Sequence, residues 1–378
     1  MTGAPAFRPA WAVVDLSAIA DNLRSVKAQA GGPEVCAVVK ADAYGHGAVP
    51  VARAVLEAGA GGLAVALVEE GVTLREAGVE APILLLSEPP PPAMDEVVAR
   101  RLVPTLYSLA GLEALERAAA GAAGARPVAA QVKLDTGMHR VGAPLEVALA
   151  VARSVERNPD LALEGVWTHL AVADDPARAE FTTGQCARFD RFCEALAGAG
   201  VRPRLRHVSN SAGALVARAC YDMVRLGITL YGYAPNPAVA VVAPLRPALS
   251  LLAEIVQVKE VEAGEGLSYG LCYRMPERSV VATVPLGYAD GVPRRLGEVG
   301  GQVLVGGYRR PIAGTVTMDH ILVDCGPGAT VEPGDEVVLL GRQGDDEITA
   351  DEWARRLGTI SYEVLCGIGA RVPRVYRP

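Results

Sequence analysis

Val35-Cys-Ala-Val-Val-Lys-Ala-Asp-Ala-Tyr-Gly-His-Gly47 is the stretch that decides the fold. Its first residues are β-branched or small and apolar, a composition typical of a strand that is buried on both faces. The apolar run stops at Lys40, and a polar loop follows in which Gly45 and Gly47 let backbone amides approach an anion closely. The pattern therefore places a lysine at the end of a buried strand, beside a loop suited to a negatively charged group.

Lys40 has a chemical and a structural interpretation. An ammonium at a strand end must be solvated, paired or neutralised, and partial burial lowers its pKa, which makes the amine a nucleophile for an aldehyde and afterwards a base. The structural alternative is a solvated lysine where a strand leaves the core. Tyr44 adds a hydroxyl to the glycine-containing loop, and this loop favours the chemical interpretation.

Length and composition limit the possible functions. The chain has 378 residues, which is enough for one large α/β barrel and a smaller domain, and its 51% hydrophobic but only 5% aromatic composition predicts cores of Ala, Val and Leu. A net charge of −7 without a Lys/Arg cluster argues against nucleic acid or an anionic membrane as a partner. We expect a small-molecule ligand.

The N-terminal residues lack an apolar signal core, and no stretch is as long as a membrane span, so we expect a cytoplasmic protein. The seven cysteines form no C-x-x-C pair and mostly have apolar neighbours. Neither a zinc site nor a disulfide framework is therefore expected.

Strand-like and helix-like segments alternate through the first part of the chain. The first helical pattern follows Ser17, the expected N-cap. Eight β/α units in this length predict a (β/α)8 TIM barrel over residues 1–240. The expected strands are Val35–Val39, Gly62–Ala66, Pro82–Leu86, Leu102–Tyr107, Val128–Leu134, Leu163–Thr168, Leu205–Val208 and Met223–Leu226.

The proline-rich segment Tyr231–Pro247 can continue neither a helix nor a strand ladder, and it predicts a domain boundary. Residues 241–378 are expected to form a mainly-β domain, with one helix announced by Thr349 and Glu352 as a capping box. The expected strands there are Leu251–Val261, Val280–Val284, Val303–Val305, Ile312–Thr317, Ile321–Val323 and Glu336–Leu340.

Polar side chains follow the strands of the predicted barrel at one end. Because active sites of such barrels lie at the C-terminal ends of the strands, we expect these residues to meet there, with a phosphate anchor after strands seven and eight. They are Lys40, Lys133, Asp135, His169, the run His207 to Ser211, Arg225, Gly227 and Ile228.

A strand-end lysine, a phosphate corner and an arginine within a strand together suggest pyridoxal phosphate, an aldehyde cofactor that carries a phosphate. Arg225 has the alternative of an ion pair with Asp222. His169 and His207 have the alternative of structural, hydrogen-bonded histidines.

Nine ordered motifs resemble those of the bacterial alanine racemases, and the resemblance extends over nearly the whole chain. It implies a TIM barrel followed by a mainly-β domain, dependence on pyridoxal phosphate, and a homodimer with shared active sites. The motifs are Ala37-Val-Val-Lys-Ala-Asp-Ala-Tyr-Gly-His-Gly47, Lys133-Leu-Asp-Thr-Gly-Met-His-Arg140, Trp167-Thr-His-Leu-Ala171, His207-Val-Ser-Asn-Ser211, Arg225-Leu-Gly-Ile228, Ser268-Tyr-Gly270, Pro285-Leu-Gly-Tyr-Ala-Asp-Gly291, Val316-Thr-Met-Asp319 and Ser361-Tyr-Glu-Val-Leu-Cys366.

The resemblance also implies a role for each matching residue. Lys40 carries the cofactor and moves a proton on the D-face of the substrate's α-carbon, and Tyr269 of the other subunit serves the L-face. Two bases on opposite faces explain racemisation between L- and D-alanine, which provides D-alanine for peptidoglycan. The other implied cofactor contacts are Tyr44, His169, Asn210, Ser211, Arg225, Gly227, Ile228 and Tyr362.

The substrate contacts implied by the resemblance are Arg140, Met318 and Tyr288, the last two from the partner subunit, and the supporting residues are Lys133, His207, Asp319 and Arg294. Many relatives carry a carbamylated lysine at the position of Lys133, and we expect one here because an ammonium would repel Arg140. His139 departs from the family pattern, in which glycine is common.

Three alternatives remain open. Serine or broad-specificity racemases share the fold, but the bulky Tyr288 and Tyr362 favour a side chain no larger than a methyl group. A non-catalytic pyridoxal phosphate carrier would lack the second domain, and the Ser268-Tyr269-Gly270 motif argues against it. A decarboxylase with the same two-domain plan is disfavoured because no cysteine-acid motif is recognisable in the second domain.

Overall fold

The computed structural model describes residues 7–121, 127–216, 221–236, 239 and 245–378. The chain forms two compact units. The barrel unit consists of Ile19–Ala43 and Ala48–Arg246, and the β unit consists of Met1–Ala18, Tyr44–Gly47 and Pro247–Pro378. The expected boundary between residues 240 and 241 lies outside the described residues. Residues up to Ala18 group with the β unit, and the division of the chain at residue 240 stays a prediction.

The described part of the barrel unit contains eight parallel strands, as the sequence predicts. Hydrogen bonds join them into two groups, ordered β4-β3-β2-β9 and β5-β6-β7-β8. A parallel bridge from Leu84 to Val103 closes one seam, and the Arg225 amide donates to the Ser209 carbonyl at 3.0 Å across the other. The TIM barrel is therefore confirmed. The strands are β2 (Glu34–Val38), β3 (Gly62–Val65), β4 (Ile83–Leu85), β5 (Thr105–Leu106), β6 (Val128–Lys133), β7 (Leu161–Trp167), β8 (Leu205–His207) and β9 (Met223–Leu226).

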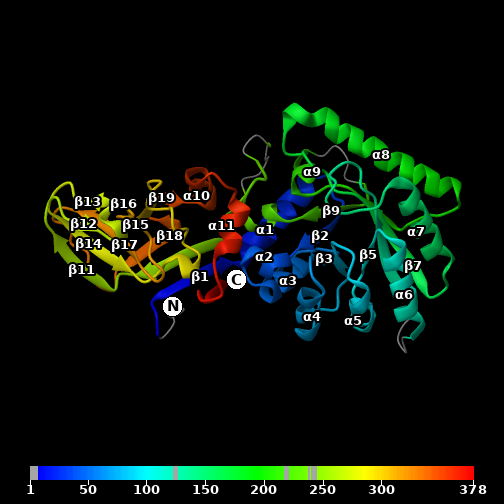
Figure 1. The fold of residues 1–378 in the computed structure, drawn as a ribbon, viewed down its shortest axis with the longest axis horizontal. Helices are drawn as coiled ribbons and strands as arrows, with labels where there is room; N and C mark the ends of the chain where they lie inside the picture. Colours follow the sequence, from blue (N-terminus) through cyan, green and yellow to red (C-terminus); the bar gives the residue numbers. More distant parts are fainter. Residues whose placement is uncertain (1–6, 122–126, 217–220, 237–238, 240–244) are drawn as a thin grey trace. The chain divides into compact units, whose positions relative to one another are not determined.

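Helices lie around the outside of these strands (Figure 1). They bury aliphatic faces at helical spacing, as α7 does with Val151, Ala152 and Val155, and the aromatic rings of Phe189 and Phe192 on α8 complete the same core. The helices are α1 (Leu16–Gln29), α3 (Ala48–Glu57), α4 (Val68–Glu76), α5 (Met94–Ala99), α6 (Leu109–Gly121), α7 (Leu145–Arg157), α8 (Ala179–Gly198) and α9 (Ser211–Val216).

Two local expectations for the barrel unit and its first helix are wrong. Ser17 is not the N-cap of α1: the Asp15 carboxylate accepts from the Ala18 amide at 2.8 Å, so Ser17 lies inside the helix. The expected strand Leu102–Tyr107 is reduced to β5 (Thr105–Leu106), because Pro104 has no N–H to donate to a ladder.

The described part of the β unit is built on a sheet ordered β16-β15-β18-β10-β1-β20, with β19 paired to β18. Strand β1, next to the edge strand β20, comes from the N-terminal part of the chain and runs antiparallel to β10 and parallel to β20. The strands are β1 (Ala10–Asp15), β10 (Leu249–Glu254), β15 (Gln302–Val305), β16 (Tyr308–Pro311), β18 (Glu336–Gln343), β19 (Asp346–Ile348) and β20 (Arg374–Arg377).

A second sheet of the β unit is ordered β11-β14-β17, from Gln257–Val261, Ser279–Val284 and Ile321–Gly326, and a short ladder pairs β12 (Gly266–Leu267) with β13 (Tyr273–Arg274). The expected strand Leu251–Val261 is divided into β10 and β11. The expected strand Ile312–Thr317 is wrong: Ile312 makes one isolated bridge, and Gly314 then turns the chain with φ +88°. The expected helix is α10 (Ala350–Leu357), where the Thr349 hydroxyl accepts the Glu352 amide; α11 (Ser361–Gly367) follows.

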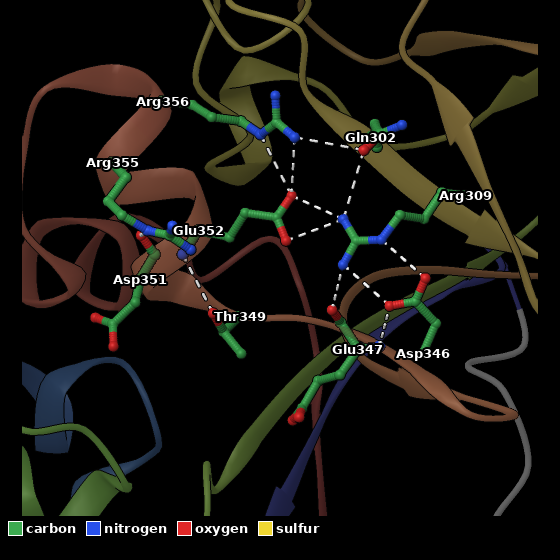
Figure 2. Close-up of polar contacts among 9 residues, drawn as sticks. All are labelled: Gln302, Arg309, Asp346, Glu347, Thr349, Asp351, Glu352, Arg355 and Arg356. Carbon is green, nitrogen blue, oxygen red and sulfur yellow. Dashed lines mark hydrogen bonds and ion pairs between the residues drawn. The ribbon is translucent and has the colours of Figure 1, made fainter.

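A cluster of ion pairs joins three elements of the β unit (Figure 2). Arg309 on β16 contacts the Asp346 carboxylate at 2.8 Å and the Glu352 carboxylate at 2.9 Å, and it donates to the Glu347 carbonyl at 2.6 Å. Arg356 contacts the same Glu352 at 3.2 Å. We call these residues the Arg309 cluster. It ties α10 to β16 and to the β18–β19 hairpin.

The described residues include no helix that is both long enough and apolar enough to cross a membrane. A search of the same residues finds no group of three or more His, Cys, Asp or Glu side chains arranged to hold a metal ion. Among the described cysteines, Cys36 and Cys325 are buried, whereas Cys272 and Cys366 are exposed.

Candidate active site

Lys40 stands where β2 changes into an unusual turn. The Val39 amide still donates to the Ala64 carbonyl of β3 at 2.9 Å, and the Lys40 side chain is half-buried. Ala41, Asp42 and Ala43 then have φ and ψ near +50°, and the φ of Tyr44 is 54°. A left-handed conformation costs a residue other than glycine about 1–2 kcal/mol, so contacts with the rest of the barrel must hold this turn.

Two cations lie over one aromatic ring inside the barrel. Lys133, at the end of β6, is 3% exposed, and its Nζ lies 4.1 Å from the ring centroid of Trp167. Arg225, within β9, is 2% exposed, and its guanidinium carbon lies 4.6 Å from the same ring. The negative face of an aromatic ring attracts cations, and this attraction offsets part of the cost of removing them from water.

Arg225 is bonded to neutral acceptors. One terminal nitrogen contacts His207 Nδ1 at 2.5 Å, and the other donates to the carbonyls of Thr168 at 2.8 Å and Val208 at 3.0 Å. The alternative ion pair with Asp222 is wrong, because the Asp222 carboxylate is held by Arg206 at 2.9 Å. Burial lowers the pKa of Arg225 to about 10, which still leaves it charged at neutral pH.

His207 completes this cluster from β8. Its ring stacks on Trp167 with 5.6 Å between centroids, and its Nε2 contacts the Gln131 side-chain oxygen at 2.8 Å. An amide oxygen only accepts, so Nε2 carries the proton, and Nδ1 of the neutral ring accepts from Arg225. Burial and then the charge of Arg225 lower the pKa of His207 far below 6.5, which keeps the ring neutral.

The same cations act on the other titratable groups at this end of the barrel. Burial, and after it Arg225 and Arg140, lowers the pKa of Lys133 to about 7. Burial and Arg225 also lower the pKa of His169 well below 6.5, with further contributions from Lys133, Arg140 and Lys40. The expected residues Lys40, Lys133, Arg140, His169, His207 and Arg225 are therefore brought together, and their charges act on one another.

The corner after β8 and β9 presents hydroxyl and amide groups. The Ser211 hydroxyl oxygen accepts from the Gly227 amide at 2.9 Å and from the Thr229 hydroxyl at 3.1 Å, so its own proton remains available for an anion. Ile228 follows Gly227 and is buried. Asn210 contacts His169 Nε2 at 3.4 Å and donates to the Leu170 carbonyl at 3.2 Å.

Arg140 is exposed at the end of a tightly bonded loop. The Asp135 carboxylate accepts from the amides of Gly137 and His139 at 2.9 and 3.2 Å, and it contacts the His139 ring at 3.0 Å. His139 has φ +56°, which explains why glycine suits this position. The buried Gln185 of α8 donates to the Thr136 hydroxyl at 3.0 Å and thus anchors the start of the loop.

Tyr269 belongs to the β unit, where it is 73% exposed. Its neighbours Ser268 and Leu271 have φ +59° and +48°, so its backbone is also strained. Thr315 holds this loop twice: its carbonyl accepts from the Ser268 hydroxyl at 2.6 Å, and its hydroxyl donates to the Tyr269 carbonyl at 3.2 Å.

Tyr288 and Met318 lie close to each other in the β unit, since the Tyr288 amide donates to the Thr317 carbonyl at 2.9 Å and both side chains are exposed. Asp319 forms an ion pair with Arg371 at 2.7 Å. Arg294 forms a long, exposed ion pair with Glu298, with 3.8 Å between a guanidinium nitrogen and a carboxylate oxygen. Tyr44 and Tyr362, the remaining expected contacts, meet in the β unit with 6.0 Å between ring centroids.

Four residues that the sequence interpretation gave no role support these sites: Gln131, Trp167, Glu70 and Thr315. The sequence did contain a signal for Gln131, because it is a polar residue within an apolar strand. It lies two positions before Lys133, so the two side chains point to the same face of the strand. Trp167 and Thr315 lie in or beside the family motifs but were not assigned. Nothing local marks the contact of Glu70 with the Ala41 amide, because this contact is formed between two β/α units.

Comparisons with known proteins give the family. Sequence models of the alanine racemase N-terminal and C-terminal domains match residues 14–235 and 248–376. The chain belongs to the alanine racemase family. A curated alanine racemase from Symbiobacterium thermophilum is 47% identical to this chain. The match covers 98% of this chain and 97% of that protein. The activity of this chain is therefore alanine racemisation, an isomerase reaction, as the motifs predict.

Solved structures agree with this assignment. An alanine racemase from Bacillus anthracis with bound L-Ala-P has a TM-score of 0.90 and 38% identity, and the match covers 99% of this chain and 96% of that one. A histidine racemase from Leuconostoc mesenteroides subsp. sake has a TM-score of 0.91 and 28% identity, with 99% of both chains covered. This fold therefore accommodates racemases named for different amino acids.

Proposed function

We propose that this chain interconverts L- and D-alanine with two bases on opposite faces of the α-carbon, Lys40 and the partner subunit's Tyr269. The observation that carries the proposal is the half-buried Lys40 at a strand end, close enough to the buried cations for its charge to lower the pKa of Lys133. Such an amine is suited to act as a nucleophile for an aldehyde and as a base. A base on each face lets a proton leave one side and return on the other.

The residues of the barrel fit pyridoxal phosphate. When bound, pyridoxal phosphate withdraws electrons from the substrate's α-carbon and so makes its proton acidic. Lys40 would hold the aldehyde carbon, Ser211 and the backbone at Gly227 and Ile228 would hold the phosphate with Tyr44 and Tyr362, and His169 with Asn210 would flank the ring. The cationic cluster suits an anionic cofactor, because the acceptors bonded to Arg225 are neutral.

Arg225 would face the ring nitrogen and keep it unprotonated, since a guanidinium does not readily give up its proton. Arg140 would bind the substrate carboxylate. We propose that Lys133 is carbamylated: burial and the surrounding cations lower its pKa to about 7, so a neutral amine able to react with carbon dioxide is available. A carbamate would accept from Arg140, whereas an ammonium would repel it.

We propose a homodimer with shared active sites because exposed apolar side chains gather on two surfaces. In the barrel unit, Leu67, Leu109, Leu145 and Phe181 are exposed at or beside the first turns of four helices, the end at which the strands carry the candidate site. In the β unit, Tyr269, Leu271, Tyr288 and Met318 are exposed, and so are Phe7, Val256, Tyr308 and Ile360. Apolar surfaces of this kind mark protein interfaces.

Tyr288 and Met318 would narrow the substrate pocket to a methyl side chain, with Asp319 and Arg294 supporting their loops. Serine is the second candidate substrate because the solved histidine racemase with this fold shows that the fold alone does not select alanine. A pocket that excludes one extra group on the substrate's side chain discriminates against that substrate by about 1–3 kcal/mol of transition-state binding. Provision of D-alanine for peptidoglycan in the cytoplasm is the corresponding biological role, and it stays a prediction.

Complementation between two inactive variants tests the proposal. Lys40→Ala and Tyr269→Phe are each expected to lose racemisation of L-alanine, followed as D-alanine formed and as deuterium incorporated at the α-carbon in D2O. In a mixed dimer, one site carries both substitutions and the other carries neither, so mixing and refolding the two variants should restore activity. Absence of recovery in a verified mixed dimer would refute the shared site, and full activity of Lys40→Ala would refute the role of Lys40.

A further inference from the structure

The left-handed turn after Lys40 is held by a side chain from another β/α unit. Glu70 lies on α4, which follows β3. Its Oε1 accepts from the Ala41 amide at 2.6 Å, directly after Lys40. Its Oε2 accepts from the amides of Ala66 and Leu67 at 2.8 and 3.1 Å. One carboxylate therefore clamps the turn after β2 to the loop after β3.

Two other bonds of the turn lie within its own segment. The Ala43 amide donates to the Val39 carbonyl at 2.9 Å, and Asp42 Oδ1 accepts from the Ala48 amide at 2.7 Å. These bonds stabilise the turn but do not fix its direction relative to the neighbouring strands. The contact from Glu70 does, because the loop between β3 and α4 is bonded to the same carboxylate.

We propose that Glu70 is a positioning residue for Lys40: its carboxylate holds the left-handed turn and thereby sets the direction in which the amine points. The proposal rests on the role of Lys40 proposed above. An ionised carboxylate is needed because both oxygens accept from N–H groups at once, and a charged acceptor makes such bonds short and strong. When the acceptor at Ala41 is lost, the turn relaxes toward ordinary φ values, and Lys40 loses its orientation while the barrel stays folded.

Glu70→Gln tests the proposal because glutamine keeps the size of the side chain but replaces one acceptor oxygen with an N–H2 donor. In the purified holoenzyme, we expect kcat to fall about 10- to 100-fold, as expected for a misplaced catalytic group, with KM changed less than threefold. Glu69→Gln, an exposed neighbour on the same helix, is the matched control and should leave kcat within twofold. Hydrogen exchange at the amides of residues 41–43 should be at least tenfold faster in Glu70→Gln only.

A glycine rescue separates this role from an electrostatic one. Glycine adopts positive φ without a steric penalty, so Ala41→Gly in the Glu70→Gln background should recover at least fivefold in kcat. Unchanged exchange at residues 41–43, or failure of Ala41→Gly to recover activity, would overturn the proposal. The exchange measurement does not depend on catalysis. A failure of the two-base function would instead appear as an active Lys40→Ala variant.

Discussion

Two arginines in this protein are stabilised in opposite ways. Arg225 in the barrel is bonded to a neutral histidine and to backbone carbonyls and lies over the Trp167 ring, and burial lowers its pKa to about 10. Arg309 in the β unit is bonded to Asp346 and Glu352 (Figure 2), and these hydrogen bonds raise its pKa. The charge of Arg309 is neutralised locally. The charge of Arg225 is stabilised by neutral groups only, so it can still attract an anionic group placed beside it.

The comparison predicts that Arg225 controls chemistry and that Arg309 controls stability. A buried cation without an anionic partner costs free energy, and such an arrangement is expected where a ligand supplies the missing charge. A cation paired with two carboxylates needs no ligand.

The largest effect is expected for Arg225→Glu. A glutamate facing the ring nitrogen of the cofactor can share a proton with it, which makes the ring a stronger electron sink and allows protonation at the cofactor carbon. We expect kcat for racemisation to fall about 100- to 1000-fold, the range for removing a preorganised electrostatic contact. Pyruvate formed per D-alanine should rise at the same time.

Arg206→Met is the control for Arg225→Glu, because Arg206 is exposed on the neighbouring strand and pairs with Asp222. It should leave both rate and product ratio unchanged. An unaltered ratio of pyruvate to D-alanine in Arg225→Glu would contradict the proposed contact with the ring nitrogen.

Arg309→Met should act on folding. Removing the guanidinium leaves Asp346, Glu352 and the Glu347 carbonyl without their partner, and we expect the free energy of unfolding to fall by about 2–3 kcal/mol. Urea denaturation measures this change, and kcat of the folded enzyme should be unchanged. Arg342→Met is the control, since its exposed pair with Glu347 spans 3.6 Å and is worth about 0–1 kcal/mol. Equal losses from both variants would show that the Arg309 cluster contributes no more than an ordinary surface pair.

The two regions should also differ in their response to pH. The pKa of His207 is lowered by burial in the folded state, so below about pH 6.5 the unfolded chain binds a proton that the folded chain does not. Stability is then lost as the pH falls from about 6.5. The pKa of Asp346 is lowered by its hydrogen bond with Arg309, so its contribution is present above about pH 4 and is lost only below that pH.

The buried His207 changes the unfolding free energy by up to about 1.4 kcal/mol per pH unit, and the declines due to His207 and to Asp346 fall in different pH ranges, so thermal unfolding between pH 8 and pH 3 can resolve them. His207→Gln should flatten the decline between pH 6.5 and 5, and Arg309→Met should flatten the decline below pH 4. If neither variant alters the decline in the free energy of unfolding, neither His207 nor Asp346 controls how stability depends on pH.

The sequence predicts these two regions unequally. The barrel strands and the residues at their ends follow from apolar runs that stop at a charged residue, as at Lys40 and Lys133, because parallel strands place their C-terminal ends together. The left-handed turn does not follow, since Ala41 and Ala43 have no local preference for positive φ. Its cause is Glu70, and a contact between different β/α units leaves no local pattern.

The β unit was predicted in outline only. Short strands and the Thr349 cap have local signals, whereas β1 joins its sheet through pairing with β10 and β20 across more than 200 residues of sequence. The Arg309 cluster is likewise formed by residues from three separate elements.

The smallest effect is expected for Trp167→Phe, which tests how Arg225 is stabilised without a carboxylate. Phenylalanine keeps an aromatic face but has a weaker quadrupole than tryptophan, so Arg225 loses part of a cation–π contact worth about 0.5–2 kcal/mol. We expect kcat to fall about two- to fivefold, the cavity from the smaller ring to lower stability by about 1 kcal/mol or more, and the ratio of pyruvate to D-alanine to stay unchanged, because Arg225 keeps its bond to His207.

Trp167→Leu is the matched comparison, because leucine fills part of the same space without an aromatic face. If the ring solvates the cations, this variant should lose several times more activity than Trp167→Phe at a similar cost in stability. Equal activities in the two variants would show that Trp167 only fills space, and the backbone carbonyls of Thr168 and Val208 would then be sufficient to hold the charge of Arg225.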